Sequence, residues 1–336
     1  MNYEEIFSLR NLYEAHKRTR RGKLRKREVA EFELDKANQL YILHEELIKK
    51  RYEVSPYRTF RIYEPKERKV DATPYRDRVV QNCFVENYLS PLLERHLIYD
   101  NAACRKGKGT DFARKRLKMF MLDSYKKHGQ RLYVLTFDIH HYFESIDHDV
   151  LKSKMRRIVQ DDEILSFVDS IIDSFNPDAG KGVPLGNQSS QCFALYYLDA
   201  FDRIIKERYG VKCYTRYMDD GIVIHHDKGL LVKLKESLSR ELESLRLEFN
   251  PAKTSIYPIK QGITYLGFTY RFTPTGGLIA KMAKKKKRRL LRHLSRHEVG
   301  KESLISYRNY LRMRSNNNRL VNAINKKLLD DKQRQN

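Results

Sequence analysis

The chain has 336 residues, enough for a buried core and for either one domain of several parts or two smaller domains. It carries 67 Lys and Arg residues against 43 Asp and Glu, so its formal net charge is +24 and nucleic acid is the partner that we expect first. The sequence has no apolar span of about 20 residues and is charged from Glu4 onward, which excludes a membrane segment and a signal peptide from our expectations.

The four cysteines lack the spacing of a zinc module or of a disulfide framework. None belongs to a Cys-x-x-Cys pair; they are Cys83, Cys104, Cys192 and Cys213. We therefore expect reduced core thiols, which are typical of a reducing cytoplasm.

The first part of the chain is predicted to contain helices, a basic run and a hairpin. Apolar residues at three- and four-residue steps predict a helix near the N-terminus and another over 28–50. The run between them, KRTRRGKLRKR at 17–27, has eight basic residues in eleven. Short β-like pieces at 57–70 predict a twisted hairpin, and a helix is expected over 76–98.

The centre of the chain alternates predicted strands with predicted helices. Two β runs, 212–217 and 221–226, are separated by a short turn and predict a tight hairpin. Two more segments, 254–259 and 263–270, are expected to complete a small antiparallel sheet. The other expected elements are a buried strand at 132–139, helices to about 159 and at 162–174, 188–208 and 229–246, and a Gly/Pro-rich loop at 177–187. A second basic run, with eight basic residues from Lys281 to Arg292, opens a helical tail.

Three aspartates lie where separate strands could bring them together. Asp138 ends an apolar strand, and Asp219 and Asp220 lie in the predicted hairpin. A buried carboxylate is costly without a counter-ion, and Mg²⁺ prefers carboxylate oxygens. Such a set can hold the two Mg²⁺ ions of nucleotide addition, one activating a 3′-OH and one binding the leaving pyrophosphate. The alternative is that Asp138 caps the next helix and the pair serves only the turn.

Five segments in a fixed order resemble the motifs of reverse transcriptases. YMDD at 217–220 resembles the catalytic hairpin of that family, and FDIHHYFESIDH at 137–148 resembles its first-aspartate motif. The others follow in the family's order: GVPLGNQSSQ (182–191) at the template and nucleotide loop, LEFNPAKTSI (247–256) at the lysine motif and TYLGF (264–268) at the primer grip. Five ordered motifs over about 130 residues make coincidence a negligible explanation.

The resemblance implies an α+β fold, a right-hand polymerase with fingers, an antiparallel-sheet palm and a short helical thumb. The implied divisions are a basic helical segment at 1–56, fingers at 57–133, a palm at 134–270 with finger-type helices inserted at about 151–182, and a basic helical thumb at 271–336.

By the same resemblance the catalytic residues are Asp138, Asp219, Asp220 and Lys253. Asp138 and Asp219 resemble the carboxylates that bridge two Mg²⁺ ions, for which Mn²⁺ can substitute, and Asp220 resembles the hairpin residue nearer the primer. The implied metal set is Asp138, Ile139, Asp219 and Asp220. Lys253 resembles the lysine that protonates the leaving pyrophosphate, and a simple phosphate contact is the alternative.

Substrate contacts are implied at the fingers, the palm and the nucleotide loop. Phe143 resembles the aromatic residue that leaves no room for a 2′-OH, with a packed core Phe as the alternative. Lys66 and Arg68 match the positions that bind the triphosphate, although as lone residues they would be solvated charges. The other implied positions are Ile139, His140, His141 and Tyr142 through their amides, Leu185, Gly186, Asn187, Gln188 and Gln191 in the loop, and Tyr265, Leu266 and Gly267 in the primer grip.

The loop at 182–191 departs from the common QGxxxSP pattern, and this departure indicates one subfamily of reverse transcriptases. Leu185 replaces the Gln, Gln191 replaces the Pro, and the result resembles the reverse transcriptases of diversity-generating retroelements. Those bacterial and phage systems copy a template-repeat RNA with frequent errors at adenine. The implied partners are template RNA, nascent cDNA, dNTPs and a small basic oligomeric accessory variability protein, in a bacterial cytoplasm and without a membrane.

Leu185 gives a hypothesis for the adenine errors. Leu cannot form the hydrogen bond that Gln offers to the incoming nucleotide, so a mismatch would lose less relative to a correct pair. The alternative is that Leu185 only packs under the fingers.

The sequence alone leaves other functions open. A retron-type or group II intron-type reverse transcriptase shares the catalytic residues, and a nucleic-acid-binding protein with a dead palm is a further alternative. The two basic runs are predicted to bind an RNA backbone or an RNA–DNA duplex, whereas a solvated face or an arm for the accessory protein would explain the same charges.

Overall fold

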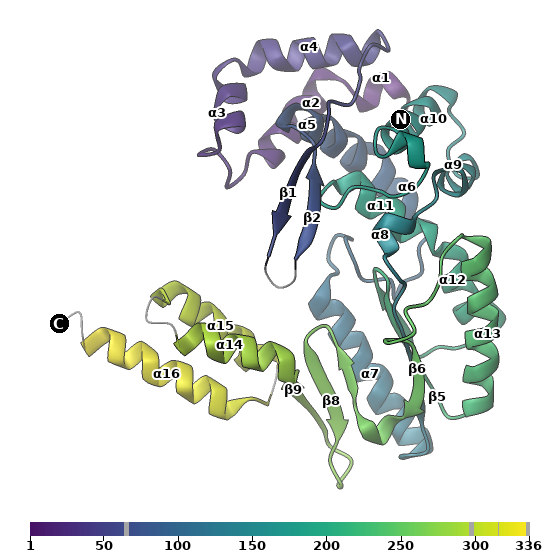
Figure 1. Cartoon of the computed structure of the whole chain (residues 1–336), viewed down its shortest axis with the longest axis vertical. Coiled ribbons are helices and arrows are strands. Elements are labelled where there is room, and N and C mark those ends of the chain that lie inside the picture. The colour runs from purple at the N-terminus through teal and green to yellow at the C-terminus, as the bar shows by residue number, and fades with distance from the viewer. Residues whose placement is uncertain (64–66, 296–298, 315, 334–336) are drawn as a thin grey trace.

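The computed structural model describes residues 1–63, 67–295, 299–314 and 316–333. Along the chain, an N-terminal group of helices leads into a hairpin, a central four-stranded sheet, a three-stranded sheet and three C-terminal helices (Figure 1). The expected α+β fold with an antiparallel sheet at its centre is confirmed. Within the described residues, no helix has the length and apolar character needed to span a bilayer.

Segments that are far apart in the sequence form the central sheet, in the order β4-β5-β3-β6. All of its pairings are antiparallel, and its strands are β3 (Tyr133–Phe137), β4 (Tyr214–Tyr217), β5 (Asp220–His225) and β6 (Ser255–Pro258). Leu135 and Phe137 belong to one buried core, whereas Val134 between them belongs to a second. Because successive side chains of a strand point to opposite faces, the sheet is buried on both sides.

Helices cover the two faces of this sheet (Figure 1). On one face lies α7 (Thr110–His128), whose buried Leu117 shares the core of Val134. On the other lies α13 (Lys228–Ser244), whose Leu234 shares the core of Leu135. The remaining helices of this region are α8 (Tyr142–Ser145), α9 (His148–Arg156), α10 (Asp162–Asp173), α11 (Gln188–Tyr197) and α12 (Asp199–Arg203).

Aspartate side chains define where three of these helices begin. Asp147, Asp161 and Asp227 precede α9, α10 and α13, and each carboxylate accepts hydrogen bonds from main-chain N–H groups of the first turn. Those groups have no partner within the helix, so an acceptor at this position stabilises the start.

The N-terminal helices pack onto the long helix that follows the hairpin. They are α1 (Tyr3–Ile6), α2 (Leu9–Thr19), α3 (Arg27–Leu34) and α4 (Lys36–Ile48), and α2 contacts α5 (Tyr75–Phe84). The buried His16 joins these parts, because one ring nitrogen lies 2.8 Å from Glu33 and the other lies 3.0 Å from the hydroxyl of Tyr75. The helix continues beyond α5 through a π-helical turn, Val85–Leu89, into α6 (Ser90–Glu94).

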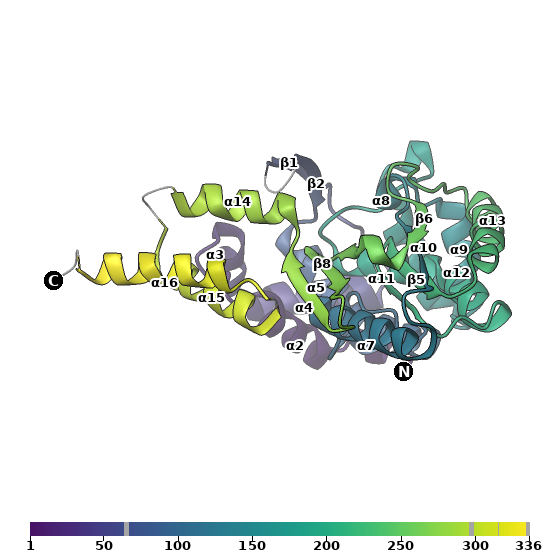
Figure 2. The same cartoon turned by 90° about the horizontal axis from the view of Figure 1, so that it is seen from below.

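A two-stranded hairpin, β1 (Arg58–Ile62) and β2 (Arg68–Ala72), projects from the helices toward the C-terminal part (Figure 1). The C-terminal part begins with a separate sheet of β7 (Ile263–Tyr265), β8 (Phe268–Phe272) and β9 (Leu278–Met282). Three helices then extend away from the sheets, as Figure 2 shows: α14 (Lys284–Ser295), α15 (Lys301–Arg314) and α16 (Asn318–Gln333).

One expectation about the sheets was wrong. Residues 254–259 and 263–270 do not complete one sheet, because β6 joins the central sheet and β7 and β8 belong to the next one. A short 3₁₀ turn, Ile259–Gln261, and Gly262 with a φ of +82° redirect the chain between them. A Cβ atom on Gly262 would lie 2.5 Å from the side chain of Arg271, so only glycine fits this turn.

Several expected long helices are interrupted. The helix expected over 28–50 divides at Asp35, the one after Asp138 divides at Ile146 and Asp147, and the one over 188–208 divides at Leu198. The apolar stripes continue across these breaks, so periodicity alone does not reveal them.

The expectation for the cysteines was correct in part. All four are free, and Cys83 and Cys192 are buried. Cys104 is exposed and Cys213 is half-buried, so these two are not core thiols.

Candidate active site

Sheet register brings the three aspartates to one edge. Asp138 follows β3 directly, Asp219 lies in the turn after β4, and Asp220 begins β5. Because Phe137 of β3 is paired with Gly221 of β5, the residues beyond each lie at the same end of neighbouring strands. A Cβ atom at Gly221 would lie 2.1 Å from the Phe137 ring, so glycine permits this close pairing.

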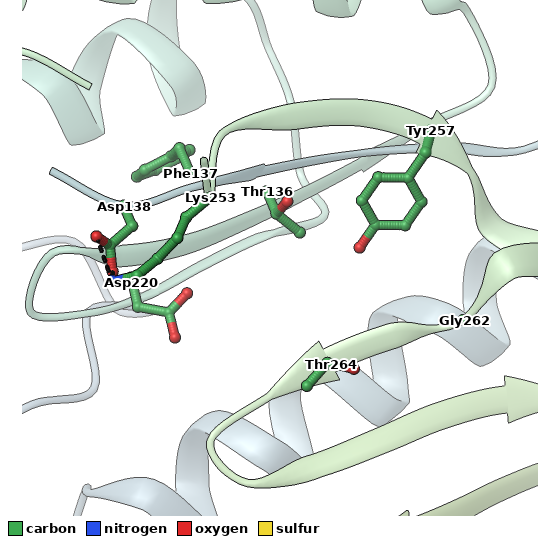
Figure 3. Close-up of a pocket in the computed structure, with 8 residues that line it drawn as sticks. All are labelled: Thr136, Phe137, Asp138, Asp220, Lys253, Tyr257, Gly262 and Thr264. Carbon is green, nitrogen blue, oxygen red and sulfur yellow. Dashed lines mark hydrogen bonds and ion pairs between the residues drawn. The ribbon is translucent and has the colours of Figure 1, made fainter. Parts of the chain in front are cut away.

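A cavity of about 400 Å³ opens at this edge. Its lining combines the sheet with the start of β7: Thr136, Phe137, Asp138, Asp220, Lys253, Tyr257, Gly262 and Thr264. In Figure 3 the Lys253 ammonium meets the Asp138 carboxylate, and the Asp220 carboxylate lies beside them. The Lys253 Nζ atom lies 2.7 Å from each Asp138 oxygen.

The remaining two carboxylates are half-buried close to the first. Burial raises the pKa of Asp219, and the neighbouring charge of Asp138 adds to that shift. Burial, with the charges of Asp219 and Asp138, raises the pKa of Asp220 to about 7. Desolvation is the larger cause of both shifts, the neighbouring carboxylates add to it, and Lys253 opposes it.

The donor set of this edge fits hard divalent cations. No three His, Cys, Asp or Glu side chains among the described residues form a finished coordination site. Three clustered carboxylates, two of them with raised pKa values, nevertheless present the oxygen ligands that Mg²⁺ prefers, together with an electrostatic need for positive charge. Release of Asp138 by Lys253 would free two further oxygens for such an ion.

The segment that carries Lys253 also supports the backbone of Asp138. The Asn250 N–H donates to the Asp138 carbonyl at 2.8 Å, and the Asn250 side chain lies 3.4 Å from Asp138 Oδ1. The next residues pair as well, since Ile139 bridges Phe249. Asn250 was not predicted from the sequence, although an Asn directly before Pro251 near the lysine motif is a turn signal that could have drawn attention to it.

The residues expected to contact a nucleotide by their amides form a sharp bend. His141 has a φ of +43° and ends the extended segment before α8. The Tyr142 side chain is buried and donates from its hydroxyl to the carbonyl of Ala194, whereas Phe143 is half-buried. The Phe143 carbonyl accepts a hydrogen bond of 2.8 Å from the N–H of Val183. The bend therefore lies directly against the start of the loop at 182–191.

The loop at 182–191 is attached by its side chains to the segment after β2 and to the helix that follows it. Thr73 donates to Asn187 at 3.3 Å, Gln188 donates to Glu86 at 3.0 Å, and Ser189 donates to Gln81 at 2.9 Å. At the other end, the Gln191 side chain accepts from the Cys104 thiol at 2.9 Å. Leu185 is half-buried, and Gly186 has a φ of +115°.

Of the two expected triphosphate ligands, Arg68 is exposed at the start of β2 and Lys66 lies outside the described residues. The hairpin reaches the nucleotide loop, because a Cβ atom on Gly186 would lie 3.6 Å from Val70 of β2. Arg68 is thus carried by the same strand that contacts the loop.

The expected primer grip forms the tight turn between β7 and β8. Tyr265 is buried, and Leu266 and Gly267 have φ values of +46° and +86°. The Leu266 carbonyl accepts from Arg114 at 2.8 Å, which ties the turn to α7. Gly267 contacts the first turn of α14, because a Cβ atom there would lie 2.9 Å from the Lys286 side chain.

Comparison with known proteins agrees with this arrangement. The reverse transcriptase (RNA-dependent DNA polymerase) family matches residues 64–270. Protein YkfC of Escherichia coli K12 is 25% identical, over 69% of this chain and 71% of its own length.

The fold is similar to that of solved telomerases. Apo telomerase from Candida tropicalis superposes with a TM-score of 0.52 at 15% identity, over 70% of this chain and 49% of that one. Telomerase from Candida albicans, in complex with a fragment of telomeric RNA, gives 0.53 at 15% identity, over 70% and 46%. This chain therefore spans about half the length of those telomerase chains, and at this identity the likeness concerns the fold alone. Since the family match covers most of the chain, including both aspartate segments, the protein belongs to the reverse transcriptase family.

Proposed function

We propose that the protein is an RNA-directed DNA polymerase that extends a DNA primer along an RNA template. The observation that carries this proposal is the convergence of Asp138 with Asp219 and Asp220 at one edge of the central sheet, beside Lys253 and an open cavity. In the reaction, the primer 3′-OH attacks the α-phosphate of a dNTP, a new P–O bond forms and pyrophosphate leaves. When bound, two Mg²⁺ ions would activate the 3′-OH and neutralise the leaving pyrophosphate.

Asp138 and Asp219 are the residues that would hold both ions, since Asp138 follows β3 and Asp219 lies in the turn between β4 and β5 at the same sheet edge. Asp220 and the main chain of Ile139 complete the set. Lys253 neutralises Asp138 in the free protein, and we assign it a second task, protonation of the leaving pyrophosphate or contact with it.

Residues around the nucleotide loop would select and hold the dNTP. The main chain of Phe143 lies next to the loop through its hydrogen bond with Val183, and its half-buried ring packs against the core. By resemblance to the family, we assign this ring the exclusion of a 2′-OH, which favours deoxynucleotides. The amides of Ile139, His141 and Tyr142 would contact the phosphates at the bend. The His140 N–H, expected to join them, instead donates to the Glu248 carbonyl at 2.9 Å. Arg68 and Lys66 of the hairpin would bind the triphosphate as the fingers close over it.

The path proposed for the template and product runs between the hairpin and the C-terminal helices. Tyr63 of the hairpin lines a cavity of about 620 Å³ together with Lys286, Arg289 and Tyr307 of the thumb. Cationic and aromatic side chains in one hollow suit a nucleic acid, since cations contact phosphates and rings stack on bases. Tyr265, Leu266 and Gly267 would support the primer end nearby.

The finer function proposed is that of a diversity-generating retroelement. The support is the loop LGNQSSQ at 185–191, with Leu185 and Gln191 at its two ends. On this proposal the template is a template-repeat RNA, copying is error-prone at adenine, and a small basic accessory variability protein is the partner in the cytoplasm of a bacterium.

Primer extension on an RNA template, followed by sequencing of the cDNA, tests both levels. We expect Mg²⁺-dependent cDNA with substitutions concentrated opposite template adenines. Absence of any extension with Mg²⁺ or Mn²⁺, with or without candidate accessory protein, would overturn the polymerase. Faithful copying of adenines would overturn the diversity-generating assignment and favour a retron- or group II intron-type enzyme.

A further inference from the structure

Arg216 is a fully buried cation one residue before the YMDD segment. Its side chain is 0% exposed and its partner Asp202, in α12, is 1% exposed. Two nearly parallel hydrogen bonds join them, from Nε to Oδ1 at 2.8 Å and from Nη2 to Oδ2 at 2.6 Å. The sequence places Arg216 in the predicted β run 212–217, but its role was not predicted. Its burial requires an explanation, because charges are buried at a high cost.

The guanidinium has donors left after it has paired with Asp202, and these reach two main-chain carbonyls. Nη2 donates to the carbonyl of Leu195 in α11 at 3.1 Å. Nη1 donates to the carbonyl of Met218 at 2.7 Å, which is the residue directly before Asp219. The side chain of Arg216 therefore connects the helices beneath the sheet to the turn that carries the two aspartates.

The conformation of this turn needs support. Met218 has a φ of +56°, a left-handed conformation that is unfavourable for a residue with a side chain. Tyr217 and Asp220 pair across the turn, so Met218 and Asp219 alone reverse the chain. A change in the backbone of Met218 would rotate the peptide that leads into Asp219.

Asp202 is itself held in place by two further groups. The Tyr214 hydroxyl donates to Oδ1 at 2.5 Å, and the Asn101 amide lies 3.5 Å from Oδ2. Tyr214 comes from the same strand as Arg216, and Asn101 comes from a loop that bridges β4. The acceptor that orients the guanidinium is therefore fixed from two sides.

We propose that Arg216, oriented by Asp202, is a positioning residue that holds the Met218 turn so that Asp219 and Asp220 face Asp138 in a metal-binding arrangement. This inference deepens the proposed function and rests on its assignment of the aspartates as metal ligands. A planar guanidinium suits the task, because it can bind a carboxylate with two nitrogens while a third reaches the turn. An ammonium cannot make the same set of bonds.

The competing explanation is that the pair only holds α12 against the sheet. A buried ion pair can often be replaced by apolar residues without loss of stability, so stability alone does not account for its presence. The pair of Lys154 and Asp199 offers a matched control. Its atoms lie 2.6 Å apart, Lys154 is 7% exposed, and its ammonium donates to Asp199, not to the YMDD turn.

The test measures Mn²⁺ binding to the full chain by electron paramagnetic resonance, without primer, template or dNTP, alongside thermal unfolding. The variants are Arg216→Lys, Asp202→Asn and the control Lys154→Met, with Asp219→Ala as the reference for abolished binding. We expect Arg216→Lys and Asp202→Asn to fold and to weaken Mn²⁺ binding about tenfold or more, the scale of changes behind a metal ligand. We expect Lys154→Met to lower the unfolding temperature while Mn²⁺ binding stays at the parent level.

Two results would overturn the proposal. One is parental Mn²⁺ affinity in folded Arg216→Lys and Asp202→Asn. The other is an equal decrease in Lys154→Met, which would indicate general loosening. If the parent binds Mn²⁺ through Asp219 but never extends a primer, the proposed polymerase function fails, while the positioning role is still decided by these affinities.

Discussion

The central sheet edge and the two basic runs both concentrate charge, but the charges lie in different environments. At the edge, Asp219 and Asp220 are half-buried, desolvation raises their pKa values, and Asp138 is paired with Lys253. In the two basic runs, 17–27 and 281–292, most charged groups are exposed. The charges at the sheet edge act through their positions, so a single substitution there should abolish primer extension. Exposed charges act through their number, so their effects should be graded and sensitive to salt.

The basic run at 17–27 contains both cations with ion pairs and cations without them. Within it, Lys17 pairs with Glu14 and Arg27 with Glu31 of their own helices, whereas Arg20 pairs with Glu33 of α3. The other five cations have no ion pair among the described residues: Arg18, Arg21, Lys23, Arg25 and Lys26. The structure thus refines the expectation that the whole run binds RNA, because part of its charge is already balanced.

The largest effect is expected at the aspartates. Asp138→Ala or Asp219→Ala should lower primer extension on the order of 10⁴-fold, the scale seen when one member of a catalytic set is removed. Asp220→Ala should be less severe, and RNA binding should remain in all three. An equal decrease in extension for Asp220→Ala would contradict the ranking. A circular dichroism spectrum that shows an unfolded variant would mean that the carboxylates are structural.

The second-largest effect on primer extension is expected at Lys253. Lys253→Ala should slow single-turnover extension about 10²-fold, since it removes a general acid or a phosphate contact. Lys253→Arg separates the two roles, because arginine keeps the contact but does not release a proton at neutral pH. Exposed Lys260 is the control. Recovery of the parental rate in Lys253→Arg would exclude the acid role, and a normal rate in Lys253→Ala would exclude both.

A graded effect is expected at the unpaired cations of the N-terminal segment. Changing Arg21, Arg25 and Lys26 to Ser should weaken RNA binding and flatten its salt dependence, by about 0.7 in logarithmic slope for each single-strand phosphate that the segment no longer neutralises. The matched control changes Lys17, Arg20 and Arg27, which removes the same charge from paired positions. If both triple variants shift the slope equally, net charge alone explains binding and the segment makes no specific interactions.

Fidelity should respond to Leu185 with a smaller effect. Leu185→Gln should reduce errors opposite template adenine severalfold, more than opposite other bases, because glutamine restores a hydrogen bond that a mismatch would lose. Sequenced cDNA from parent and variant measures this. The half-buried position leaves packing as the alternative, and unchanged adenine errors would move the cause to Arg68, the RNA or the accessory protein.

The smallest effect concerns stability and pH. Burial lowers the pKa of His16, so the folded state favours the neutral ring. The stability that depends on this neutral form is complete above the unfolded pKa of about 6.5 and is lost as pH falls toward the lower folded value. His16→Gln should therefore flatten the decrease of the unfolding temperature between about pH 7 and pH 5. An unchanged pH profile would show that His16 does not titrate during unfolding.

The sequence predicted the aspartate site better than it predicted how the strands divide between the two sheets. Asp138 after an apolar strand and YMDD between two β runs are local patterns, and the register placed them together as expected. The division of the sheets at Gly262 depends on a positive φ and on close contact with Arg271, which no local pattern reveals. The support of Asp138 by Asn250 likewise joins segments more than a hundred residues apart.

The most direct test of the central claim is crystallographic location of Mn²⁺ by anomalous scattering, in a complex with RNA template, DNA primer and a non-reactive dNTP analogue. We predict two Mn²⁺ peaks, both within coordination distance of Asp138 and Asp219, and Lys253 turned away from Asp138. Peaks remote from Asp138 and Asp219, or an Asp138–Lys253 pair that persists with the nucleotide bound, would contradict the claim that these aspartates hold the catalytic metals.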